Sequence, residues 1–245
     1  MGKSINTIGI IGFGRFGCLL AKYLSEDFHV KVSSNSRDAD TVSESGGELT
    51  SLEDVCQCDV IIPAVPISVF QETIQNIASL VGENLVIDVC SVKEYPVAQL
   101  EEYLPHQTQI LATHPMFGPD SAGDTIAGQK IVIYDVRIPG EQYECIRTYL
   151  REKGLTVIEA SPEEHDRQIA RSQVLTHFIG RGLGLYGAKD IDIDTEGYKR
   201  LLKILDVVGN DTSQLFIDMN KYNRFAESAR SEFICALKEI EQELR

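Results

Sequence analysis

Hydrophobic positions in the first two thirds of the chain gather into short apolar runs, separated by stretches with apolar residues at helical spacing. Such runs are typical of buried strands, and the spaced pattern predicts helices between them. The expected strands are residues 7–11, 29–33, 59–62, 84–89, 110–114, 128–133 and 156–159, and two of the expected helices are residues 67–80 and 141–153. Because strands and helices alternate, we predict an α/β fold with a doubly wound sheet. Residues 40–52 show no regular pattern, so we expect an irregular segment before a short helix that Ser51 begins.

The pattern changes near residue 160. Ser161 and Pro162 predict a helix start, and no later run is typical of a strand. We therefore predict two domains, residues 1–160 and 161–245, the second all-helical. Apolar residues recur at helical spacing along the last helix, at Phe225, Phe233, Ile234, Leu237 and Ile240. A small helical domain could hardly bury this stripe alone. We therefore expect the second domain to be a dimerisation domain and the protein to be a homodimer.

A glycine-rich turn follows the first expected strand and precedes a helix. It consists of Gly12, Phe13, Gly14, Arg15, Phe16 and Gly17. In this strand–turn–helix context the first glycine permits a tight turn, the second lets a pyrophosphate approach the backbone, and the third lets helix and strand pack closely. The helix N-terminus adds unpaired N–H groups that favour phosphate. We predict a Rossmann-type dinucleotide-binding domain.

The end of the second expected strand indicates which dinucleotide binds. A carboxylate at this position usually binds the ribose 2′-hydroxyl of NAD. This chain instead has Ser34, Asn35, Ser36 and Arg37. Hydroxyls, an amide and an arginine suit a 2′-phosphate, so we predict NADP; the alternative is a polar turn with a solvated arginine. Ala64, Val65 and Pro66, which follow the strand at 59–62, are expected beside the nicotinamide.

Charge and cysteine content narrow the function classes. The net charge of −14 argues against nucleic-acid binding, which needs a basic face. Six scattered cysteines form no zinc-site spacing, so we expect no metal and interpret them as reduced thiols of a cytoplasmic protein. No apolar run reaches membrane-spanning length, so we expect no membrane partner. The first strand begins within a few residues of Met1, which we expect leaves no room for a signal or transit peptide.

Two strand exits carry candidate chemistry. Ser91 and Lys93 follow the strand at 84–89, and His114 ends the next one. Ligands of open α/β sheets bind outside the carboxyl ends of strands, so all three are placed to meet a ligand. A histidine at such an exit is a candidate general base. The alternatives are a helix-capping serine, a surface lysine and a structural histidine.

The first long helix of the second domain carries Gln173 and His177 four residues apart, which places them on one face. Asp166 lies eleven residues before His177, on roughly the same side. His177 can equally be a satisfied interior histidine, and the spacing alone leaves this choice open.

Five motifs in this order carry a family resemblance. They are the glycines at 12, 14 and 17, the DVCSVK stretch at 88–93, THPMFGPD at 113–120, EHD at 164–166 and SQVLTH at 172–177. Together they resemble the prephenate/arogenate dehydrogenase family over nearly the whole chain, and the third and fifth are most similar to its plant-type arogenate dehydrogenase branch. The resemblance implies a Rossmann domain, a helical dimerisation domain and oxidative decarboxylation of a small-molecule substrate, arogenate or prephenate, to tyrosine or 4-hydroxyphenylpyruvate.

The resemblance also implies residue roles. His114 is implied as the catalytic base, with Ser91 bonded to the substrate hydroxyl or to that histidine. Gln173 and His177 are implied as substrate contacts. Where many bacterial relatives have an arginine for a substrate carboxylate, this chain has Lys203; Lys199 and Arg200 are further candidates.

A preference for arogenate is expected from Asp211, because a carboxylate would pair with the ammonium that arogenate carries and prephenate lacks. The plant-like branch has an acidic residue there, and we expect Asp211 to begin the final helix; the alternative is that it only caps that helix. The function we predict is NADP-dependent conversion of arogenate to tyrosine, with prephenate dehydrogenation as the alternative. A 3-hydroxyacid or imine reductase would leave the His-Pro-Met motif unexplained, and a cofactor-binding sensor would have no reason to keep Ser91, His114 and His177 together.

Overall fold

The computed structural model describes residues 5–35 and 38–245. The chain forms two compact units, Met1–Pro162 and Glu163–Arg245, which are called here the sheet unit and the helical unit. The first is α/β and the second contains helices and loops but no strand, as the hydrophobic pattern predicts. Within the described residues, no helix is long and apolar enough to cross a membrane.

The sheet unit is built on one eight-stranded sheet with strand order β3-β2-β1-β4-β5-β6-β7-β8 among the described residues. The strands are β1 (Thr7–Ile11), β2 (His29–Ser33), β3 (Gly47–Leu49), β4 (Val60–Pro63), β5 (Leu85–Asp88), β6 (Gln109–Pro115), β7 (Lys130–Arg137) and β8 (Thr156–Glu159). Neighbouring strands are parallel except that β7 is antiparallel to β6. The order reverses between β1 and β4, so the doubly wound prediction is confirmed. Open α/β sheets commonly bind ligands at such a reversal, outside the carboxyl ends of the strands.

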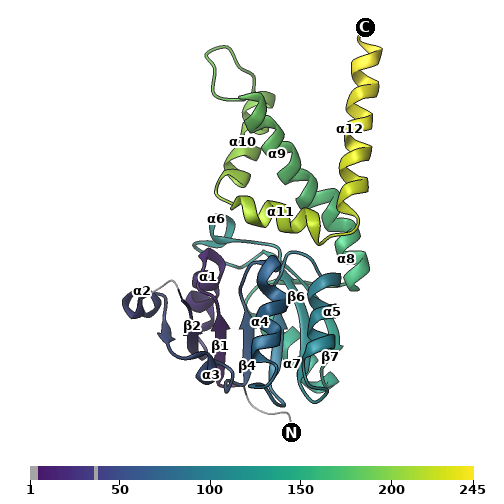
Figure 1. Ribbon diagram of the computed structural model, residues 1–245. Helices are drawn as coiled ribbons and strands as arrows, with labels where there is room; N and C mark the ends of the chain where they lie inside the picture. The colour runs from purple at the N-terminus through teal and green to yellow at the C-terminus, as the bar shows by residue number, and fades with distance from the viewer. Residues whose placement is uncertain (1–4, 36–37) are drawn as a thin grey trace. The chain divides into compact units, whose positions relative to one another are not determined.

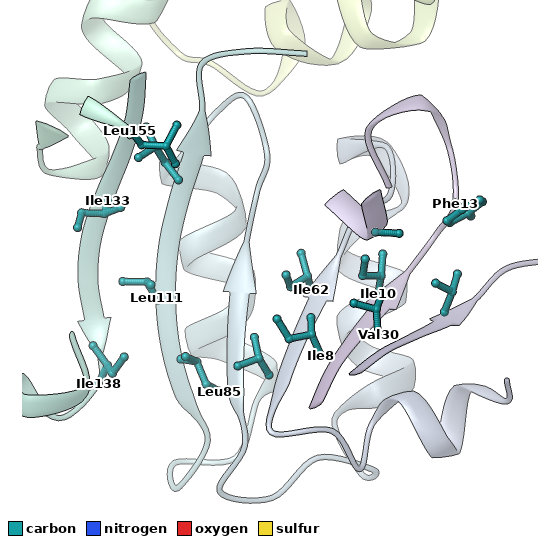
Figure 2. Packing of buried hydrophobic residues seen from close by; sticks show 14 of the residues in the cluster. Ile8, Ile10, Phe13, Val30, Ile62, Leu85, Leu111, Ile133, Ile138 and Leu155 are labelled. Atoms are coloured by element: carbon teal, nitrogen blue, oxygen red, sulfur yellow. The ribbon is translucent and has the colours of Figure 1, made fainter. Parts of the chain in front are cut away.

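Helices cover both faces of this sheet. On one face, α1 (Arg15–Leu24) and α7 (Gly140–Glu152) contribute side chains to a core cluster with β1, β5 and β6. Figure 2 shows part of this cluster, in which Ile10, Leu85 and Leu111 come from different strands and pack in one apolar layer. On the other face, α4 (Phe70–Ile77) and α5 (Glu94–Tyr103) lie side by side in front of the strands in Figure 1.

The prediction that residues 40–52 are irregular is wrong. They contain most of α2 (Ala39–Glu44) and the edge strand β3, which pairs in parallel with β2. Asp38 caps α2 by accepting a hydrogen bond of 2.9 Å from the Thr41 N–H, and Val42 is its one buried apolar side chain. A helix and a strand with so few apolar residues leave no periodicity, so tertiary pairing decides their structure.

Other boundaries differ by a few residues. Ser51 does cap a short helix, α3 (Leu52–Val55). The helix expected at 67–80 begins as a 3-10 turn, η1 (Ile67–Val69), and α4 ends at Ile77. The loop after β6 contains a further short helix, α6 (Pro119–Ala122), which the sequence pattern did not indicate.

The helical unit consists of α8 (Pro162–Ile169), a π-helical turn η2 (Ala170–Val174), α9 (Leu175–Tyr186), α10 (Glu196–Gly209), α11 (Ser213–Lys221) and α12 (Ala226–Glu243). Its small core gathers Ile169, Val174, Met219 and Ala226. Helices α9 and α10 approach closely at Gly180, where an added Cβ would lie 2.5 Å from a Val208 methyl. The expectation that Asp211 begins the final helix is wrong, because it lies between α10 and α11 while the final helix starts at Ala226.

Candidate functional site

The turn between β1 and α1 has the geometry that a dinucleotide requires. Gly12 has φ of +96°, and a Cβ on it would lie 2.6 Å from the Ala64 carbonyl oxygen. A Cβ on Gly17 would lie 2.4 Å from the Gly12 carbonyl oxygen, whereas one on Gly14 would meet no described atom within 4 Å. Gly12 and Gly17 are therefore required by the fold, and Gly14 leaves open space beside the backbone.

Helix α1 presents its N-terminus at this open space. Gly14 is the N-cap and makes no side-chain hydrogen bond, and the first turn contains no acidic residue. Unpaired N–H groups and the positive end of the helix dipole suit a pyrophosphate, so these residues fit a dinucleotide. Phe13 is buried in the core and offers only its backbone, while the exposed Arg15 guanidinium is 2.7 Å from an Asp120 carboxylate oxygen.

The residues that follow β2 are polar, and the first acidic one caps a helix. Ser34 and Asn35 follow the strand, while the predicted contacts Ser36 and Arg37 lie outside the described residues. The first acid beyond the strand, Asp38, caps α2. The exit of β4 lies beside the glycine turn, because the Ala64 N–H donates to the Ile11 carbonyl at 2.8 Å. Ala64 and Val65 therefore border the turn, since a Cβ on Gly12 would lie 3.1 Å from a Val65 methyl as well as close to the Ala64 carbonyl.

Parallel pairing of β5 and β6 brings the two catalytic candidates to one sheet edge. The strands are in register with Asp88 opposite Ala112, so Ser91, which follows β5, and His114, near the end of β6, both lie at the carboxyl ends. The side chains of His114 and Ser91 are both buried. The Ser91 hydroxyl oxygen is buried and has no hydrogen-bond partner among the described residues. A buried hydroxyl costs free energy unless it is bonded, which fits a serine that awaits a substrate hydroxyl or the His114 ring.

The Lys93 ammonium bonds within the protein, although the sequence places Lys93 where a ligand could meet it. Its ammonium is buried and donates to the Asp88 carboxylate and to the Thr113 carbonyl. The Thr113 hydroxyl donates to the Asp88 carbonyl at 2.7 Å, and the Cys90 N–H donates to the Asp88 carboxylate at 2.7 Å. Burial raises the pKa of Asp88, and the Lys93 ammonium opposes this shift. These groups are called here the Asp88–Lys93 network.

In the helical unit, His177 and Asp211 lie together. The His177 Nε2 is 3.5 Å from an Asp211 carboxylate oxygen, and the ring is buried with no described partner for Nδ1. Burial lowers the pKa of His177 and nearby Arg181 lowers it further, while Asp211 opposes the shift. The lowered pKa favours the neutral imidazole over the charged form.

The capping alternative for Asp211 is wrong. The cap of α11 is Thr212, whose hydroxyl accepts a hydrogen bond of 3.1 Å from the Leu215 N–H. Gln173 lies in the π-helical turn η2, and its side-chain carbonyl oxygen is buried with no described partner. The Gln173 side chain therefore carries a buried polar atom that no described residue of the helical unit engages.

The Asp166 side chain lies in the interior of the helical unit. It is fully buried, its carboxylate is 2.7 Å from Nδ1 of His165, and its backbone carbonyl accepts a hydrogen bond from the Asn223 amide. Its carboxylate is held in the interior by its sequence neighbour His165.

Arg181 is a candidate that the sequence reasoning missed. It donates to the Asp211 carbonyl at 2.8 Å, its guanidinium lies 5.7 Å from the Phe216 ring centre, and its Nε has no described partner. Its spacing of four residues after His177 would have indicated it. The earlier candidates are more exposed: Lys203 lies on the outside of α10, Lys199 is 3.6 Å from Asp194, and Arg200 is 3.5 Å from Glu196.

No group of three metal-ligating side chains gathers anywhere in residues 5–35 and 38–245.

Comparisons with known proteins agree on one family. Residues 21–159 match the family model described as prephenate dehydrogenase, nucleotide-binding domain, and residues 183–245 match a model described as TYRAAT1-like, C-terminal domain. Arogenate dehydrogenase 2, chloroplastic, of Arabidopsis thaliana is 32% identical over 97% of this chain and 69% of its own length. Arogenate dehydrogenase 1, chloroplastic, from the same plant is 31% identical over 97% of this chain, which spans only 39% of that relative.

Solved structures show the same fold. A prephenate dehydrogenase from A. aeolicus, in complex with hydroxyphenyl propionate and NAD+, superposes with a TM-score of 0.78 at 19% identity, covering 100% of this chain and 92% of that one. An arogenate dehydrogenase from Synechocystis superposes with a TM-score of 0.72 at 19% identity, covering 97% and 91%.

Proposed function

This chain belongs to the prephenate/arogenate dehydrogenase family, and we propose that it converts arogenate to tyrosine with NADP. The enzyme class, an NAD(P)-dependent oxidoreductase, follows from the family. The observation that carries the proposed chemistry is the pairing of β5 with β6. It brings to one edge of a Rossmann-type sheet both His114 and the Ser91 hydroxyl, which has no hydrogen-bond partner among the described residues.

The proposed reaction needs one base and accurate positioning. His114 accepts the proton of the substrate 4-hydroxyl while C4 is oxidised, and Ser91 donates a hydrogen bond that holds the hydroxyl or the imidazole. When bound, the nicotinamide supplies the hydride acceptor. The bond between the ring and its carboxylate then breaks, CO₂ leaves, and its electron pair completes the aromatic ring. Aromatisation drives this step, so the protein contributes orientation and proton transfer.

The cofactor preference rests on the segment after β2. Ser34, Asn35, Ser36 and Arg37 offer donors and a positive charge, and the carboxylate that would repel a 2′-phosphate is missing from this segment. We propose that Gly12–Gly17 cradle the pyrophosphate and that residues 64–66 border the nicotinamide.

The substrate contacts are proposed from the helical unit. Gln173 and His177 offer hydrogen bonds, and the Asp211 carboxylate would pair with the arogenate ammonium. Arg181 or Lys203 would bind a substrate carboxylate. Arg181 is favoured because it is partly buried beside His177 and Asp211. The homodimer and a cytoplasmic location remain our proposals from the apolar last helix and the six free cysteines.

The direct test is turnover of the purified protein with arogenate and prephenate, each with NADP and NAD, followed by absorbance of the reduced nicotinamide and chromatography of the product. We expect tyrosine from arogenate with NADP to give the highest kcat/KM. A higher kcat/KM with prephenate would assign the alternative substrate, and turnover of neither would reject the proposed function.

The proposed preference for NADP over NAD is tested with a separate variant. Arg37→Ala should weaken NADP binding at least about tenfold while NAD binding changes little, because only NADP carries the 2′-phosphate. Isothermal titration calorimetry measures the dissociation constants of both cofactors and so checks this prediction. Equal weakening for both would mean that Arg37 has no contact specific to the 2′-phosphate.

A further inference from the structure

We propose that Lys93 is a positioning residue, whose buried ammonium ties the exit of β5 to β6 and so fixes the placement of Ser91 relative to His114. The inference rests on the proposed function of those two residues. It assigns to Lys93 a role at the site without contact with substrate or cofactor.

The connectivity of the network supports this role. Asp88 is the last residue of β5, and Thr113 immediately precedes His114. The Lys93 ammonium bonds to both, so one cation links the strand that leads to Ser91 with the strand that carries His114. Ser91 lies between Asp88 and Lys93 in the chain, in a turn that this ion pair closes.

Further bonds reinforce the same turn. The Cys90 N–H binds the Asp88 carboxylate, and the Thr113 hydroxyl binds the Asp88 carbonyl, each at 2.7 Å. Neither Asp88 nor Lys93 is more than 1% exposed. The turn is therefore held by its own backbone, by the carboxylate and by the neighbouring strand.

Stability alone is a weak reason for this arrangement. Removing two charges from water costs about as much as their attraction returns, and apolar replacements of buried ion pairs are often neutral or stabilising. Chemistry, by contrast, is sensitive to position, since a displacement of about 1 Å can cost about 10² in rate. A buried ion pair between two reacting groups is therefore better explained by the geometry that it imposes.

A direct ligand role is less consistent with the structure. The ammonium is almost inaccessible, and it already donates to a carboxylate and a carbonyl. A substrate carboxylate would have to displace the Asp88 carboxylate, which would then be left buried without its cation.

The test compares Lys93→Met with the double variant Asp88→Asn/Lys93→Met, which removes both charges and so avoids an unpaired buried carboxylate. Lys153→Met is the matched control, since it removes an ion pair of 2.6 Å to Asp27 elsewhere in the sheet unit. Melting temperature, kcat and KM for arogenate and NADP are measured for each. In addition, the ring resonances of His114 are followed by NMR of histidine-labelled protein, with His114→Asn for assignment.

We expect the double variant to fold, to lose about 10- to 100-fold in kcat, to keep both KM values within about threefold, and to shift the His114 resonances. The control should keep its kcat and its His114 spectrum. An unchanged kcat and an unchanged spectrum in the folded double variant would overturn the proposal and leave the network merely structural. A tenfold rise in the arogenate KM at constant kcat would overturn it in favour of a substrate contact.

Failure of the proposed function is distinguishable from failure of this inference. If the wild-type protein turns over neither substrate, the function is rejected, and the His114 spectrum alone decides the positioning role: shifted resonances in the double variant support it, and unshifted ones overturn it.

Discussion

His114 shows how a residue obtains a fixed position at the sheet edge from its place on a strand. It is the penultimate residue of β6, buried, and paired in register with Val132 of β7. Backbone pairing on both sides of β6 restricts where the imidazole can be placed. This rigidity suits a base that must meet a substrate proton within hydrogen-bond distance.

His114→Asn should keep the fold and NADP binding but reduce kcat by at least about 10²-fold, the scale of a lost general base. Steady-state kinetics and calorimetric NADP binding measure the two quantities. Turnover close to that of the wild type would show that another group takes the hydroxyl proton.

Asp211→Asn should shift the ratio of kcat/KM toward prephenate. The carboxylate is 29% exposed, close to His177 and not a helix cap, so the asparagine removes charge without removing a cap. A charged hydrogen bond is worth about 1.5–3 kcal/mol, which corresponds to a change in substrate preference of about ten- to a hundredfold.

Competition between the two substrates measures this ratio, and Asp206→Asn on the exposed side of α10 is the matched control. If the ratio is the same in both variants and the wild type, the preference for arogenate must come from another residue.

At the scale of elements, the β1–α1 turn combines two demands that a single glycine pattern satisfies. Gly17 lets the helix lie against the Gly12 carbonyl, and Gly14 leaves the helix N-terminus accessible. The first demand belongs to packing and the second to binding, so substitutions should separate them.

Gly14→Ala should leave the melting temperature within a few degrees of the wild type but weaken NADP binding at least about tenfold, because the new methyl occupies open space beside the backbone. Gly17→Ala should lower the melting temperature as well, since its Cβ would meet a carbonyl oxygen at 2.4 Å. Thermal unfolding with and without NADP measures both effects. Unchanged NADP affinity in Gly14→Ala would place the pyrophosphate elsewhere.

At the scale of the whole molecule, the two units differ in how well they bury their apolar residues. Eleven of the fifteen large hydrophobic residues that are exposed within the described chain belong to the helical unit. On α12 these are Ile234, Leu237 and Ile240, three of the five residues of the stripe that the sequence singled out. An uncovered stripe of this kind is typical of an interface between identical subunits.

Light scattering should therefore give a dimer at micromolar concentration, and Ile240→Glu should shift it toward the monomer because a charge would be buried at the interface. Val69→Glu, at a similarly exposed apolar position of the sheet unit, is the control. A monomeric wild-type protein would contradict the prediction.

Local rules explain what the sequence by itself determined. Apolar runs locate most strands because buried parallel strands are apolar on both faces. The glycine pattern locates the turn because Gly12 has a left-handed backbone conformation that other residues rarely adopt. His114 and Ser91 were indicated as candidate site residues because both lie where a strand ends. Open α/β sheets bind their ligands outside the carboxyl ends of the strands.

Only the tertiary structure decided how polar side chains pair. The burial of Lys93, its bond to Thr113 twenty residues away, and the approach of Asp211 to His177 all join residues that the sequence separates. Tertiary structure also decided that β3 is a strand. Its hydrogen bonds come from pairing with β2, and its few apolar residues do not indicate that pairing. Periodicity reports which face a residue occupies, whereas the partner of a buried charge depends on which strands and helices fold beside it.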